Sequence, residues 1–176
     1  MQYRKGKLIV NNSGGTSSKQ SKTYKVCLPN SWVKELGLSE NNRELELRFD
    51  GKSIIISQKE SLDEYIASNK GNELLQLDFY NFDTLCTSII ADYTTKTVRI
   101  ENKNDDIIHL AFGKLEYPTW ENYLEFLEER CIPKSRMGIK TYLEVIGVDE
   151  YNPLDIIMKT EGRMAEDHQW LKVKKL

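Results

Sequence analysis

Residues that could do acid–base chemistry lie side by side near the C-terminal end. Glu166, Asp167 and His168 are consecutive, and a carboxylate beside an imidazole can transfer a proton or bind a metal. A metal site needs several convergent ligands, and no HExxH pattern or second histidine at helical spacing accompanies this run. His109 is the one other histidine of the sequence. We therefore interpret both histidines as ordinary surface or core side chains.

The remaining candidates for chemistry are pairs of acids and a pair of glycines. Glu128–Glu129 and Asp149–Glu150 have the character of a solvated charged surface. The sequence contains no GxxxxGK[ST], GxGxxG or GxSxG pattern, and Gly14–Gly15 is followed by no phosphate-binding motif. We expect no enzyme here, with no catalytic residue, no metal and no cofactor.

The cysteines and the apolar runs bear on where the protein works. Cys27, Cys86 and Cys131 form no CxxC pair, which is typical of reduced thiols in a cytoplasm. The longest apolar runs, such as the one around residues 54–56, are too short to span a bilayer. The N-terminus has basic residues but no apolar stretch of signal-peptide length. We expect a cytoplasmic protein without a membrane segment.

Charge is divided unevenly along the 176 residues, although the formal net charge is only -2. Residues 1–34 contain seven basic side chains and no Asp or Glu. Residues 1–59 hold 11 basic and 5 acidic side chains, net +6, whereas residues 60–176 hold 14 and 22, net -8. This division makes the first third a candidate for contact with a polyanion, with a solvated basic surface as the alternative.

The elements that would position these charges are short. Residues 7–11 and 23–29 have the composition of strands, and the Asn/Ser/Gly stretch 11–21 between them predicts a loop. A helix capped by Asn30 or Ser31 should follow and end at Gly37. Asp50-Gly51 between two β-rich runs predicts a hairpin. Such a module has little core of its own and is often completed by a partner chain.

This order of elements resembles the AbrB/MazE/SpoVT swapped-hairpin DNA-binding family. The resemblance is carried in particular by residues 25–59, "KVCLPNSWVKELGLSENNRELELRFDGKSIIISQK". The resemblance implies an intertwined homodimer in which two chains exchange hairpins to form one β-barrel. It also implies double-stranded DNA as a partner, with a roughly palindromic operator. The loop here is longer than in the common short form because of the Gly14–Gly15 insertion.

By position, the resemblance gives DNA contact to basic and small polar residues of the first strand and the following loop. These residues are Arg4, Lys5, Lys7, Ser17, Ser18, Lys19, Lys22, Thr23 and Lys25. A second set has helical spacing and should form the core or the dimer contact. It consists of Trp32, Val33, Leu36 and Leu38.

The rest of the chain has a different character. Residues 60–73 are polar and are interpreted as a linker, and residues 74–176 as a small α+β interaction domain. Strands are expected at 74–82, 87–91 and 96–102. Three helices should follow, the first capped by Thr119, the second beginning near Ser135, and the third starting at Asn152-Pro153. The tail 167–176 could add a further strand.

Residues 111–136 and 142–173 resemble a compact domain of phage and conjugative-element proteins of Firmicutes, found beside AbrB-like domains and near HipA-like kinase modules. The fold class expected for the whole chain is α+β, a dimeric swapped-hairpin barrel followed by antiparallel strands and about three helices. Two functions stay open. One is a dimeric, sequence-specific regulator of a phage or mobile-element operon with a C-terminal partner-binding domain. The other is a protein-binding inhibitor, such as an antitoxin or phage anti-defence (anti-CRISPR-type) protein, whose first domain autoregulates.

Overall fold

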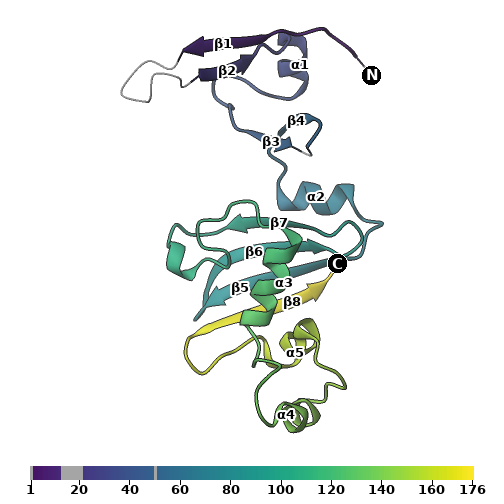
Figure 1. Ribbon diagram of the computed structural model, residues 1–176, viewed down its shortest axis with the longest axis vertical. Coiled ribbons are helices and arrows are strands. Elements are labelled where there is room, and N and C mark those ends of the chain that lie inside the picture. Colours follow the sequence, from purple (N-terminus) through teal and green to yellow (C-terminus); the bar gives the residue numbers. More distant parts are fainter. Residues whose placement is uncertain (1, 13–21, 50) are drawn as a thin grey trace. The chain divides into compact units, whose positions relative to one another are not determined.

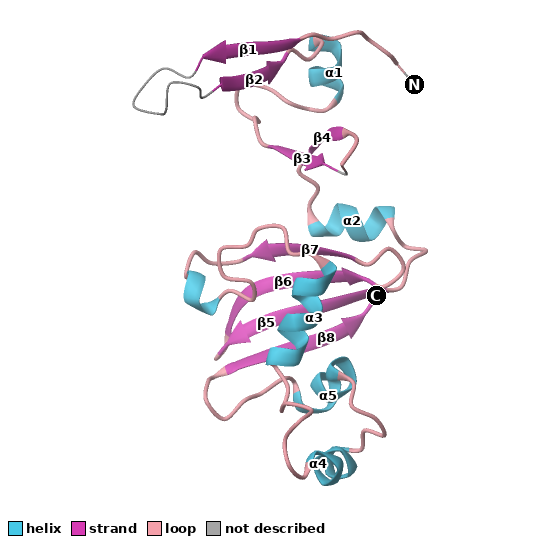
Figure 2. Ribbon diagram, in the orientation of Figure 1, coloured by secondary structure: helices cyan, strands magenta, loops and turns pink. Residues whose placement is uncertain are grey.

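The computed structural model of the chain describes residues 2–12, 22–49 and 51–176. The chain divides into two compact units, an N-terminal unit of residues 1–60 and a C-terminal unit of residues 61–176 (Figure 1). In both units, helical and antiparallel β structure occur together (Figure 2). The mixed α+β class expected from the sequence is therefore confirmed.

Two hairpins and one short helix make up the N-terminal unit. The elements are β1 (Leu8–Asn12), β2 (Lys22–Val26), α1 (Asn30–Glu35), β3 (Leu45–Phe49) and β4 (Ile54–Gln58). β1 pairs with β2 and β3 with β4, each pair antiparallel and each a separate sheet. Among the described residues of this one chain, the two hairpins do not close into a barrel.

The first helix shows how local sequence fixes an end of an element. Neither Asn30 nor Ser31 caps α1, contrary to expectation, because the residue before the helix is Pro29, which makes no side-chain cap. The other end agrees with the sequence. Gly37 has φ +65, a backbone conformation that glycine adopts without steric cost.

The C-terminal unit is built on one antiparallel sheet with the strand order β7-β6-β5-β8 (Figure 2). Its strands are β5 (Leu74–Asn81), β6 (Thr84–Asp92), β7 (Thr97–Asn102) and β8 (Gln169–Lys175). Its helices are α2 (Leu62–Ser68), the 3-10 turn η1 (Ile107–His109), α3 (Trp120–Glu129), α4 (Ile139–Ile146) and α5 (Pro153–Thr160). The last strand thus returns to pair with the first one of the sheet.

The main core lies between the sheet and α3, which crosses one sheet face (Figure 1). Leu77, Phe79 and Ile89 point to this face, and Tyr123 and Leu127 of α3 are buried against them. The helix begins at Thr119, whose hydroxyl accepts the amide of Asn122 while the Asn122 side chain accepts the amide of Thr119. This reciprocal cap satisfies two amides that a helix start otherwise leaves unpaired.

The segment expected as a linker is part of the C-terminal unit. Residues 62–68 form α2, which Ser61 and Glu64 cap reciprocally. Tyr65 packs with Leu74 and Ile90 in a second, smaller core. α2 belongs to this unit because its few apolar side chains pack against the sheet. The polar composition of residues 60–73 did not indicate this packing.

The second predicted helix begins later than expected. α4 starts at Ile139 and not near Ser135, because Gly138 has φ +83 and separates the helix from the preceding turn. Gly147 ends it, as expected, with φ +70. The third helix follows the prediction, since Asn152 caps it through the amides of Leu154 and Asp155 and Pro153 occupies its first position.

Candidate nucleic-acid interface

The register of the β1–β2 hairpin separates an apolar face from a polar one. Leu8 pairs with Val26 and Val10 with Tyr24, and cross-strand partners share a face of the ladder. The next positions, where Asn11 pairs with Thr23, lie on the opposite face. The hairpin therefore presents one face for packing and one for polar contact.

The polar face also carries charge. Lys25 pairs with Ile9 on this side and is exposed. Lys22, at the other end of β2, pairs with Asn12 and lies on the apolar side instead. Of the two β2 lysines among the residues expected to contact DNA, Lys25 thus shares a face with Thr23 and Lys22 does not.

The three basic residues before β1 lie in an exposed segment. Arg4, Lys5 and Lys7 are all exposed and precede the first residue of the strand. Gln2 begins this segment and accepts a hydrogen bond of 2.6 Å from the indole Nε1 of Trp32. This bond links the start of the basic segment to α1. The expected sites Ser17, Ser18 and Lys19 lie outside the described residues.

The four apolar residues expected as core or dimer contact differ in burial. Leu38 is buried, with 9% of its surface exposed. Trp32, Val33 and Leu36 are half-buried in the single chain. Just past the C-terminal end of α1, the backbone amide of Leu38 donates a hydrogen bond to the backbone carbonyl of Val33.

The β3–β4 hairpin repeats the two-faced pattern. Leu47 pairs with Ile56 and Phe49 with Ile54, and this apolar face is largely open, with Leu47 63% and Phe49 72% exposed. The opposite face carries Glu46, which is buried and lies 3.8 Å from the Nε of Arg48. Both hairpins of the unit therefore expose an apolar face.

The acid–imidazole run of the C-terminal unit is used in contacts within the fold. Asp167 accepts hydrogen bonds from the guanidinium of Arg130, the shortest at 2.6 Å. The His168 ring stacks on Phe82 with ring centroids 4.0 Å apart. The other histidine, His109, contacts the carboxylate of Asp106 at 2.8 Å. No group of acids, histidines and cysteines among the described residues could hold a metal ion.

Arg130 has a structural role that the sequence did not indicate. It is 7% exposed and binds the carbonyls of Gly162 and Gln169 as well as Asp167. The hydrogen bond and positive charge of Arg130 hold the pKa of Asp167 below its usual range. Nothing in the sequence around Arg130 marks these contacts, because the partners of Arg130 follow more than 30 residues later.

The three thiols differ in access. Cys86 and Cys131 are buried and Cys27 is exposed. Burial raises the pKa of Cys131 to about 12, so its thiolate is scarce at neutral pH. Cys86 and Cys131 thus act as small apolar core residues.

Comparison of the chain with protein-family models, with curated proteins and with solved structures gives no match. Within the part of the chain that the structure describes, no helix is both long and apolar enough to cross a membrane.

Proposed function

We propose that the protein is a dimeric DNA-binding regulator whose N-terminal unit contacts double-stranded DNA and whose C-terminal unit binds a protein partner. The observation that carries this proposal is the two-faced register of the β1–β2 hairpin. One face is apolar and exposed, which favours association with a second chain. The other is polar and basic, which favours contact with phosphate.

The apolar faces support the dimer. Val10, Tyr24 and Phe49 are 51%, 59% and 72% exposed in the single chain. Two-stranded hairpins are at best marginally stable alone, and contiguous open apolar patches mark interaction sites. A second copy of the chain would bring two more hairpins and cover these faces. The swapped-hairpin barrel is the arrangement of this kind that the family resemblance implies.

The polar side supports contact with DNA. Thr23 and Lys25 share a face of β2, and Arg4, Lys5 and Lys7 lie exposed before β1. Lysine and arginine neutralise phosphates, and hydroxyl and amide groups add directional hydrogen bonds to the backbone. A two-fold dimer would repeat this surface and favour a roughly palindromic operator.

The test is binding of the purified full-length protein to the DNA upstream of its own gene, measured by fluorescence anisotropy at several salt concentrations. We expect preference over scrambled DNA and a fall of log affinity with log salt of about 0.9 per phosphate contacted. Absence of binding at low salt would refute the regulator. Equal binding to scrambled DNA would refute sequence specificity.

One observation favours the protein-binding inhibitor as a second candidate. The C-terminal unit has a large excess of acidic side chains, since residues 61–176 hold 14 basic and 21 acidic ones, net -7. Such a surface suits a basic, nucleic-acid-binding target, because complementary potentials steer encounter. In this reading the C-terminal unit masks a toxin or a host defence protein, and the DNA-binding unit regulates its own operon.

A further inference from the structure

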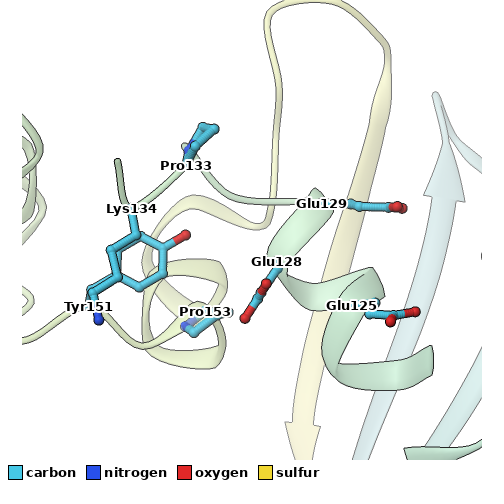
Figure 3. A pocket seen from close by; sticks show the side chains of 7 residues that line it. All are labelled: Glu125, Glu128, Glu129, Pro133, Lys134, Tyr151 and Pro153. Atoms are coloured by element: carbon cyan, nitrogen blue, oxygen red, sulfur yellow. The ribbon is translucent and has the colours of Figure 1, made fainter. Parts of the chain in front are cut away.

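Three hollows of the C-terminal unit meet at the side chain of Tyr151. The first, of about 640 Å³, lies between the second half of α3 and the start of α5 (Figure 3). The second, of about 670 Å³, follows α4, and the third, of about 320 Å³, reaches Tyr93. Because Tyr151 lines all three, they adjoin one another. Together they are here called the α3–α5 groove.

The floor of the groove is apolar and fixed. The hydroxyl of Tyr151 donates to the carbonyl of Ile132 at 3.0 Å, which holds the ring in place. Pro133 and Pro153 lie on either side of it (Figure 3). The remaining apolar lining residues are Leu124, Leu127, Leu154, Ile139, Leu143 and Val148. A rigid apolar floor of this kind suits the central anchor of a docked chain.

The rim of the groove is acidic. Six carboxylates and two lysines, Lys134 and Lys140, line the first two hollows. The acids are Glu125, Glu128, Glu129, Glu144, Asp149 and Glu150. The ammonium of Lys134 lies 5.9 Å from the centre of the Tyr151 ring. The rim therefore carries a net negative charge of four.

These six carboxylates lack the partners that other acids of the unit have. Elsewhere Asp167 pairs with Arg130, Glu161 with Arg163, and Glu101 with Lys103. Across residues 2–12, 22–49 and 51–176, by contrast, no ion pair involves any acid of the rim. Their negative potential is therefore not cancelled locally and favours a cationic occupant.

The spacing of the acids indicates which cation. The described residues include no cluster of three acids, histidines or cysteines that could hold a metal ion, so the rim carboxylates do not converge on one point. A ligand that matches them must carry several cations spread along its length. Nucleic acid has the wrong sign of charge. Arginine and lysine side chains have the right sign, and their aliphatic stems can pack on an apolar floor.

We propose that the α3–α5 groove binds a basic segment of another protein, with an apolar or aromatic side chain of that segment seated beside Tyr151. The inference rests on the partner-binding role of the C-terminal unit in the proposed function and gives that role a place and a chemistry. It applies equally to a regulator that receives a partner and to an inhibitor that masks one.

The experiment uses the full-length protein and a short fluorescein-labelled peptide of alternating arginine, lysine and leucine with one central tryptophan. Anisotropy gives the affinity for the protein and for the variant Glu125→Lys/Glu128→Lys/Glu129→Lys. We expect the variant to bind at least about tenfold more weakly, because attraction along one side of the groove becomes repulsion. Circular dichroism checks that the variant is folded.

The matched control is Asp105→Lys/Glu116→Lys/Glu166→Lys, which changes the charge equally at exposed positions outside the groove lining. An equal loss in this control would overturn the proposal, because overall charge and not the groove would then set the affinity. A second variant, Tyr151→Ala, should weaken the tryptophan peptide more than a peptide with glycine at that position. Equal losses for the two peptides would remove the apolar anchor from the proposal.

Two further probes identify the occupant. Spermine that displaces the peptide at equal charge concentration would assign the groove to a small polycation. A peptide of residues 2–7, which contains Arg4, Lys5 and Lys7, would overturn the assignment to another protein if it bound more tightly than the probe. DNA binding by the groove variant should equal that of the charge-matched control variant, because both carry the same added positive charge. This readout separates failure of the groove from failure of the DNA-binding proposal.

Discussion

The hydroxyl of Tyr65 donates a hydrogen bond of 2.9 Å to the carboxylate of Asp92, which has none of its surface exposed. This bond joins α2 to the end of β6. The same carboxylate accepts the side-chain amide of Asn72 and the backbone amides of Thr94 and Thr95. Burial alone would raise the pKa of Asp92, but these hydrogen bonds outweigh it and hold the pKa below its usual value.

Replacing Tyr65 with phenylalanine should lower the free energy of unfolding of the C-terminal unit by about 1.5–3 kcal/mol, the range for hydrogen bonds to charged groups. The ring stays, so the packing with Leu74 and Ile90 is kept. Urea denaturation followed by tryptophan fluorescence measures the change. Tyr117→Phe, at a position 56% exposed, is the control and should change little. A Tyr65→Phe protein as stable as the wild type would show that α2 is held by packing alone.

The ion pair between Arg130 and Asp167 predicts that the stability of the C-terminal unit depends on pH. The guanidinium of Arg130 lowers the pKa of Asp167 in the folded state, whereas an aspartate in the unfolded chain has a pKa of about 4. The stabilisation is therefore fully present above about pH 4 and is lost as the pH falls through the lower folded value. The stability difference between the wild type and Asp167→Asn should accordingly shrink between neutral pH and about pH 3.

Denaturant titrations of both proteins at several pH values measure this difference. Asp105→Asn, at an exposed position, serves as the control. A gap between wild type and Asp167→Asn that is constant over this range would mean that the ion pair contributes nothing to stability.

A charge on the open face of the β3–β4 hairpin tests the dimer. Leu47 is 63% exposed in the single chain, so Leu47→Glu should cost less than about 0.5 kcal/mol if that face stays in water. If a second copy covers the face, the buried charge should shift the protein from dimer to monomer. Analytical ultracentrifugation measures the distribution. Ile108→Glu, at a position 83% exposed in the C-terminal unit, should leave it unchanged.

The basic residues of the N-terminal unit predict a loss of DNA affinity without loss of the dimer. Arg4→Ala/Lys7→Ala/Lys25→Ala should weaken binding to the upstream DNA and reduce the salt slope by about 0.9 for each phosphate contact removed. The control Lys70→Ala/Lys114→Ala/Lys159→Ala changes the charge equally in the C-terminal unit, at three exposed positions. If the two triple variants lose affinity alike, net charge and not the β1–β2 hairpin determines binding.

Local signals in the sequence predicted those parts of the fold that depend on neighbours along the chain. Thr119 and Asn152 cap their helices as expected, since a cap needs only the next three amides. The pairing of β8 with β5 was not predictable, because about 90 residues separate the two strands and no turn sets their register. The same reason hides the contact between Arg130 and Asp167.

The faces of the candidate interface also depend on contacts between distant residues. The sequence marks Lys25 and Lys22 as equally basic, and the cross-strand register is what puts them on opposite faces of the β1–β2 hairpin. The α3–α5 groove had no signal of its own. Its acids come from α3, α4 and the residues before α5, and each stretch by itself has the composition of a solvated surface.

The pairing of β8 with β5 has a consequence for synthesis on the ribosome. β5 and β6 emerge early, but Leu77 and Phe79 on β5 remain at an open edge until residues 169–175 leave the exit tunnel. The sheet of the C-terminal unit can therefore be completed only after translation of that unit ends. The hairpins of the N-terminal unit are released long before, and they are free to meet another nascent or finished chain while the second half is still being made.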